Sequence, residues 1–241
     1  MPKAKLTHLI TALTGIFGET ESAVREYARR LREAGLIATG QSGRYGGAPM
    51  TPQDAAILLT ALMASNHAAH APEAAKHYIR TRPMELAGKS QDYSGVLLRG
   101  LASLPAEHNF LDALAAIIGA SADGSMKEAY GKYWHLHLIQ ITAITPWGCS
   151  IVGDIRIGRR IVPRRTRPRI IARGISRVVQ YVEVGKPIWH TKSFMKWNAE
   201  RSALSLEENL AGLTGEGEQH RIVRGIVISR LGAALRGDAL E

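Results

Sequence analysis

The sequence has only one cysteine, Cys149, among its 241 residues. A single cysteine excludes an internal disulfide and any cluster of thiolates that could hold zinc or an iron–sulfur centre. No apolar run approaches the roughly 18 residues needed to cross a bilayer. The first residues also lack the continuous apolar stretch of a secretory signal. We therefore expect a cytoplasmic protein with no membrane-spanning segment.

Motifs of common enzyme chemistry are missing as well. The sequence contains no P-loop, no dinucleotide-binding fingerprint, no zincin motif and no nucleophile elbow. Hydrophobic residues make up 45% of the chain and charged residues 22%, which is typical of a globular protein. These observations predict a folded, non-enzymatic protein without a cofactor or a catalytic metal.

Positive charge is the most informative feature of the composition. Lysine and arginine number 31 against 21 acidic residues, which gives a net charge of +10. A protein this basic is attracted to polyanions, and nucleic acid is the commonest polyanion in the cytoplasm. The excess lies in two segments: residues 1–50 carry seven basic and four acidic side chains, and residues 156–201 carry 13 against two.

The N-terminal segment predicts two amphipathic helices separated by a glycine. Apolar residues recur at three- and four-residue spacing between Lys3 and Phe17, and Gly18 interrupts the pattern. Thr20 is suited to cap a second helix that continues to about Ala34. Its buried stripe is predicted to be Val24, Tyr27, Ala28 and Leu31, and Gly35 ends it as a left-handed cap.

A glycine-rich hairpin is expected next. Residues 36–39 form a short strand-like stretch, residues 41–47 are rich in glycine, and residues 48–50 could return as a second strand. Thr51 and Pro52 then form a strong helix start, and the following helix is predicted over 53–64.

This order of elements resembles the winged helix-turn-helix domain of bacterial and phage transcription regulators. The resemblance extends from Leu6 to about Met50, and the residues that carry it are Gly18, Thr20, Val24, the run Arg29–Ile37 and the wing-like Gly43–Gly47. It implies that the second helix enters the major groove of DNA and that the hairpin contacts the minor groove or phosphates.

The helical rotation of 100° per residue supports this interpretation. It places Ser22, Arg25, Glu26 and Arg29 opposite the apolar stripe, where arginine can make a bidentate contact to guanine that discriminates by roughly 1–3 kcal/mol. The residues predicted to contact DNA are Lys3, Lys5, Thr20, Ser22, Arg25, Glu26, Arg29, Arg30, Arg44 and Tyr45.

The remainder of the chain is predicted to complete an α+β protein. A winged helix-turn-helix over 1–65 is followed by a helical connector over 66–92 and a mixed α+β domain over 93–241. Helices are predicted over 96–104 and 110–118, followed by a loop over 119–125. A β-hairpin is expected from strands over 135–144 and 150–157, with a strand or helix over 176–184. Residues 219–235 have apolar residues at helical spacing.

The second basic segment forms a strip of arginines. Nine arginines and no acidic residue lie between Arg156 and Val182, and prolines keep the middle extended. The strip could follow a phosphate backbone, or it could pair with glutamates near the C-terminus. Its predicted contact residues are Arg159, Arg160, Arg164, Arg165, Arg167, Arg169 and Arg173.

Three functional hypotheses follow from these patterns. The first is a sequence-specific transcriptional regulator, a repressor or activator, that binds double-stranded DNA as a homodimer, since two-fold pairing over a palindromic site doubles the specificity of one short helix. The second is an accessory protein of recombination or replication that binds nucleic acid through residues 156–177. The third is a protein-interaction module that antagonises another regulator.

Overall fold

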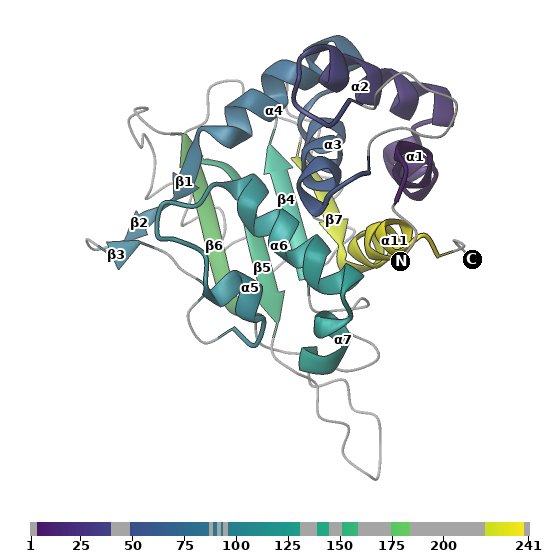
Figure 1. The fold of residues 1–241 in the computed structure, drawn as a ribbon. Coiled ribbons are helices and arrows are strands. Elements are labelled where there is room, and N and C mark those ends of the chain that lie inside the picture. Colours follow the sequence, from purple (N-terminus) through teal and green to yellow (C-terminus); the bar gives the residue numbers. More distant parts are fainter. Residues whose placement is uncertain are drawn as a thin grey trace.

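The computed structural model describes residues 4–39, 49–86, 89–90, 93, 96–130, 139–144, 151–158, 175–183 and 220–238 (Figure 1). Helices and an antiparallel sheet pack together in an α+β fold. The predictions for Lys3, Arg44, Tyr45 and the seven arginines from Arg159 to Arg173 fall outside these residues.

The sheet has five antiparallel strands in the order β1-β6-β5-β4-β7. These are β1 (Thr81–Pro83), β6 (Ile175–Glu183), β5 (Ile151–Gly158), β4 (Ile139–Ile144) and β7 (His220–Arg224). A buried row crosses it, because Ile141 pairs with Val223 on one side and with Ile155 on the other, and Ile155 pairs with Val179. A separate pair, β2 (Glu85–Leu86) and β3 (Lys89–Ser90), follows β1.

Two helices at the centre of the fold, α3 (Pro52–Ala64) and α6 (Phe110–Ala122), pack against each other in front of the sheet (Figure 1). Every side chain of α3 from Asp54 to Ala64 is buried, so this helix has no solvent face. Around these two lie α1 (Leu6–Leu13), α2 (Glu21–Glu33), α4 (Ala71–Ile79), α5 (Arg99–Ala102), α7 (Ser125–Tyr130), α11 (Gly225–Arg236) and the short 3₁₀ turns η1 (Ile16–Gly18) and η2 (Ala68–His70).

The two ends of the described chain share this core. Helix α1 packs against α11, and α3 packs against α6, β4 and β7. The C-terminal helix approaches α6 very closely at Gly232, where an added Cβ would lie 2.3 Å from Ser121 Oγ and 2.9 Å from the Ser121 carbonyl carbon. Arg236 then donates a hydrogen bond of 2.8 Å to the Ser121 carbonyl. One hydrophobic cluster thus includes buried residues from helices α1, α3, α6 and α11.

A buried chain of hydrogen bonds ties the segment before α6 to the sheet. His108 Nδ1 donates to the carbonyl of Pro105 at 2.7 Å, and Nε2 shares a hydrogen bond of 2.9 Å with the Tyr181 hydroxyl. The hydroxyls of Tyr181 and Tyr93 share a further hydrogen bond of 2.9 Å. Burial raises the pKa of Tyr181 well above its ordinary value, which keeps this phenol neutral.

Several predicted elements are confirmed. Thr51 caps α3 in a capping box with Asp54, and Pro52 occupies its first turn. The hairpin expected from residues 135–144 and 150–157 forms as the antiparallel pair β4–β5, with residues 135–138 and 150 outside the described part of the chain. The element over 176–184, left open between strand and helix, is strand β6.

Other predictions were wrong. Residues 36–39 form no strand; instead the amide of Ala38 donates to Asp54 Oδ1 at 2.9 Å, which turns the chain toward the start of α3. The helix expected over 219–235 begins only at Gly225, because His220–Arg224 pair with β4. The loop expected over 119–125 is helical up to Ala122. The first helix, whose apolar pattern continues to Phe17, ends already at Leu13. Helix over 96–104 is restricted to Arg99–Ala102, and the connector over 66–92 also supplies strand β1.

Candidate nucleic-acid interface

Helix α2 begins with the predicted cap. The backbone amide of Ala23 donates to Thr20 Oγ1 at 3.2 Å, and the hydroxyls of Thr20 and Ser22 lie 2.9 Å apart. Gly35 has a φ of +70°, a conformation that favours glycine, and it ends the helix as predicted. These caps fix a 13-residue helix whose length and start agree with the sequence prediction.

The inner face of α2 is the predicted apolar stripe. Val24, Tyr27, Ala28 and Leu31 are all at most 2% exposed. The Tyr27 hydroxyl donates to the Ser65 carbonyl at 3.0 Å, just beyond the end of α3. Burial raises the pKa of Tyr27, so the phenol keeps the proton that this hydrogen bond needs. Helix α2 is thus held by packing along its length and by a polar tie to the chain after α3.

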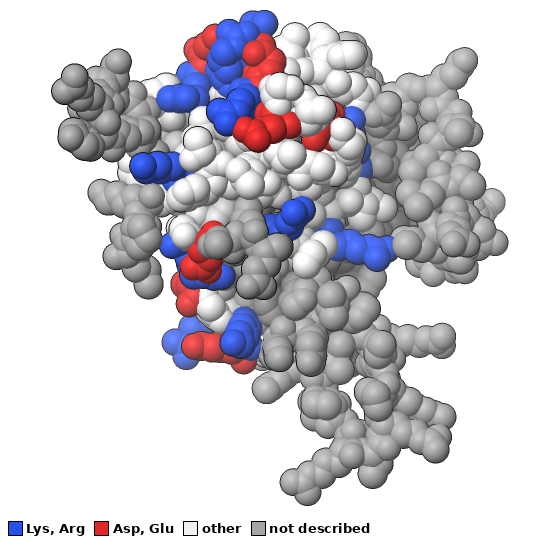
Figure 2. Space-filling model, turned by 90° about the vertical axis from the view of Figure 1, so that its right-hand side faces the viewer, with Lys and Arg blue, Asp and Glu red and all other residues white. Residues whose placement is uncertain are grey.

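The outer face of α2 is exposed to solvent. Ser22, Arg25 and Arg29 lie there, and the two arginine side chains are 55% and 51% exposed. Basic and acidic side chains gather together at the top of the molecule in Figure 2, where α2 lies in Figure 1. The structure therefore leaves accessible the residues that the sequence predicted to contact DNA from this helix.

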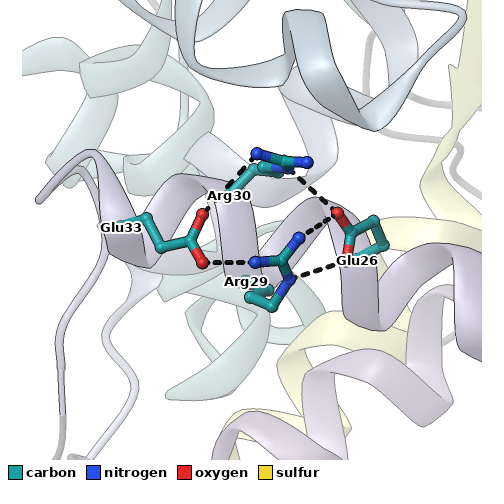
Figure 3. A network of polar contacts seen from close by, with 4 residues as sticks. All are labelled: Glu26, Arg29, Arg30 and Glu33. Carbon is teal, nitrogen blue, oxygen red and sulfur yellow. Dashed lines mark hydrogen bonds and ion pairs between the residues drawn. The ribbon is translucent and has the colours of Figure 1, made fainter.

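These arginines pair with glutamates of the same helix (Figure 3). Arg29 Nε donates to Glu26 Oε2 at 2.7 Å, and Arg29 also pairs with Glu33. Arg30 Nε donates to Glu26 Oε1 at 2.9 Å. One turn earlier, Arg25 Nε donates to Glu21 Oε1 at 3.0 Å. Helix α2 carries four arginines and three glutamates, so its own formal charge is only +1.

Glu26 is the centre of this network. The hydrogen bond from Arg29, followed by that from Arg30, lowers the pKa of the Glu26 carboxyl to about 2. The same contact raises the pKa of the Arg29 guanidinium. Glu26 therefore remains ionised at any physiological pH and holds both arginines along the surface of the helix.

The other predicted contact residues are divided between this helix and its surroundings. Thr20 serves as the cap, and Arg30 lies partly buried beside the exposed stripe. Lys5 is exposed at the start of α1. The structure thus brings together Thr20, Ser22, Arg25, Glu26, Arg29 and Arg30 on or beside one helix.

Arg221 of β7 was not predicted from the sequence to have a role near α2. Its guanidinium carbon lies 5.0 Å above the ring centroid of Phe17 in the turn before α2, and Nη1 donates to the Leu62 carbonyl at the end of α3. Residues Leu62 and Arg221 are 159 positions apart. Local periodicity carries no signal for such a contact, since it depends on β7 joining the edge of the sheet.

The described residues contain no group of three His, Cys, Asp or Glu side chains that could hold a metal ion. None of the helices in the described ranges is long and apolar enough to cross a bilayer. Comparison with known proteins finds no matching family model, no similar curated protein and no similar solved structure. Function must therefore be inferred from the geometry and charge of the site.

Proposed function

We propose that this protein is a sequence-specific DNA-binding transcriptional regulator whose helix α2 reads base edges in the major groove. The observation that carries the proposal is the exposed stripe of Ser22, Arg25 and Arg29, on a capped helix whose opposite face is fully buried. A recognition helix needs this combination, because one face must be anchored while short polar and cationic side chains reach the bases.

The ion pairs of α2 are compatible with this role. Arg25 and Arg29 pair at exposed positions, where an ion pair stabilises only weakly because water screens it. A bidentate contact from arginine to guanine discriminates by about 1–3 kcal/mol. Exchange of a glutamate partner for a base edge is therefore favourable where the matching base is present, and the glutamates oppose binding where it is not.

The winged helix-turn-helix arrangement and the homodimer belong to the same proposal. Helix α1, the turn η1 and helix α2 follow in the order that such a domain requires. A single helix of this size contacts few base pairs, and two-fold pairing over a palindromic operator would double the contacts. The net charge of +10 would assist association with DNA of any sequence.

Selection from a pool of random duplexes tests the proposal. The wild-type chain should enrich one sequence with two-fold symmetry, and the double variant Arg25→Ala plus Arg29→Ala should lose that preference. The matched control is Arg80→Ala plus Arg82→Ala, which removes the same charge from two exposed arginines at the end of α4 and in β1. If the control and the α2 variant keep the same preference, α2 does not read DNA.

The near-neutral charge of α2 favours a second candidate, a protein-docking surface that antagonises another regulator. Alternating arginine and glutamate side chains suit a partner with the complementary alternation better than a uniformly negative backbone. This candidate predicts no affinity for duplex or single-stranded DNA at physiological salt. An accessory role in recombination or replication instead predicts sequence-tolerant binding with one salt slope for every duplex.

A further inference from the structure

The turn before α2 contains a strained residue. Phe17 has φ 58° and ψ 20°, and it is the one non-glycine residue with a positive φ in the described part of the chain. A bulky side chain rarely adopts this left-handed conformation unless its surroundings hold it there. The turn is closed by hydrogen bonds between backbone groups, including Gly15 N to Glu19 O at 2.9 Å and Glu19 N to Ile16 O at 3.1 Å.

Phe17 packs against the hydrophobic core and is contacted from the sheet by Arg221. Its guanidinium lies within cation–π distance of the Phe17 ring, at 5.0 Å. The same group donates to the Leu62 carbonyl and lies 3.3 Å from Asn66 Oδ1. One side chain of the edge strand β7 therefore contacts the α1–α2 turn, the last turn of α3 and the segment that follows.

The second tie of α2 lies close by. Tyr27 donates to Ser65, whose neighbour Asn66 is a partner of Arg221, and the charge of Arg221 acts on the Tyr27 phenol. Helix α2 is consequently held at its preceding turn by Arg221 and at its middle by Tyr27. Both side chains make their hydrogen bonds to residues at or just after the end of α3.

We propose that Arg221 is a positioning residue that fixes the α1–α2 turn against α3 and the sheet edge, and so sets the orientation of the exposed face of α2. Its effect on DNA rests on the proposed function above, whereas its effect on the turn does not. Because the guanidinium is engaged by Phe17, the Leu62 carbonyl and Asn66, the proposal assigns Arg221 no phosphate contact of its own.

The test measures amide hydrogen exchange and DNA binding of the full chain. In Arg221→Ala, the amides of Gly15, Gly18 and Glu19 should exchange about tenfold faster or more, while those of α6 keep their wild-type rates. The matched control is Arg224→Ala, which removes an exposed arginine from the same strand. Unchanged exchange in the turn of Arg221→Ala would overturn the proposal, whether or not the protein binds DNA.

DNA binding then separates orientation from direct contact. Arg221→Ala should weaken binding to the selected operator about tenfold at equal folded fraction, with the same dependence on salt, because no phosphate contact is lost. A decrease of about 0.9 in that slope would identify Arg221 as a phosphate contact and overturn the proposal. Operator affinity equal to that of Arg224→Ala would also overturn it.

Two further variants keep the test decisive if Arg221→Ala unfolds. Arg221→Lys keeps the charge and loses the planar fork, and Phe17→Leu removes the ring and keeps an apolar side chain. Both should accelerate exchange in the turn by a smaller factor. If wild-type protein binds no DNA, the proposed function fails, and exchange in the turn alone decides the role of Arg221.

Discussion

Replacement of Glu26 by glutamine should strengthen the binding of DNA, although it removes a side chain from the candidate interface. Glu26 contacts both Arg29 and Arg30, at 2.7 and 2.9 Å, and the variant releases both from its charge. An exposed ion pair favours its closed state by a factor of about 1.4 to 5, so loss of two pairs predicts an increase of about two- to twenty-five-fold in affinity for random duplex. The released arginines contact any phosphate, and the ratio of operator to random affinity should therefore fall.

Fluorescence anisotropy with a labelled duplex, measured at several salt concentrations, provides the assay. The matched control is Glu107→Gln, which makes the same change in charge at an exposed glutamate that pairs with Arg82 at 3.2 Å. Glu107→Gln should increase affinity only by the small amount that one added net charge produces. Equal effects of the two variants would refute the masking of arginines by Glu26. Weaker binding by Glu26→Gln would instead mean that the carboxylate itself accepts from a base.

Three other predictions concern stability. Gly232→Ala should lower the free energy of unfolding in urea by about 2 kcal/mol, because the cost of overpacking against Ser121 exceeds the gain in helix propensity. The control Gly100→Ala should cause no such loss, since there is open space around Gly100. Tyr27→Phe should cost about 1 kcal/mol through loss of a buried hydrogen bond, which the same titration would detect. Since the pKa of Glu26 is lowered from 4.5 to about 2, its contribution is complete above pH 4.5 and lost toward pH 2, so the difference in stability between wild type and Glu26→Gln should vanish over that range.

The features of α2 that the sequence predicted correctly are all local. The Thr20 cap, the stripe from Val24 to Leu31 and the left-handed Gly35 depend on residues within a few positions of one another. Such interactions act in the same way in almost any tertiary context, and residue spacing therefore reveals them. The exposure of Arg25 and Arg29 follows directly, since the opposite face of the helix is occupied.

The features that the sequence failed to predict depend on distant partners. Ile222 and Val223 fit a helical spacing, yet they form a strand because β4 offers an edge with which they can pair. Residues 36–39 have strand-like composition, but Asp54 accepts the amide of Ala38 and directs the chain elsewhere. The ion pairs of α2 can be predicted from residue spacing, because Glu26 lies three and four residues before Arg29 and Arg30. The contact between Arg221 and Phe17 cannot be predicted in this way.

Helix α1 packs against α11, the last helix of the described chain, and this has a consequence for the order of assembly. During translation α1 and α2 leave the ribosome long before α11 has been made. The apolar surface of α1 that packs against α11 therefore stays uncovered until then. A nascent chain that stops before β7 lacks Arg221 and the whole of α11, and it would expose the inner side of α1 to chaperones and proteases. The contacts that hold α2 in place would therefore form only after β7 and α11 have been made.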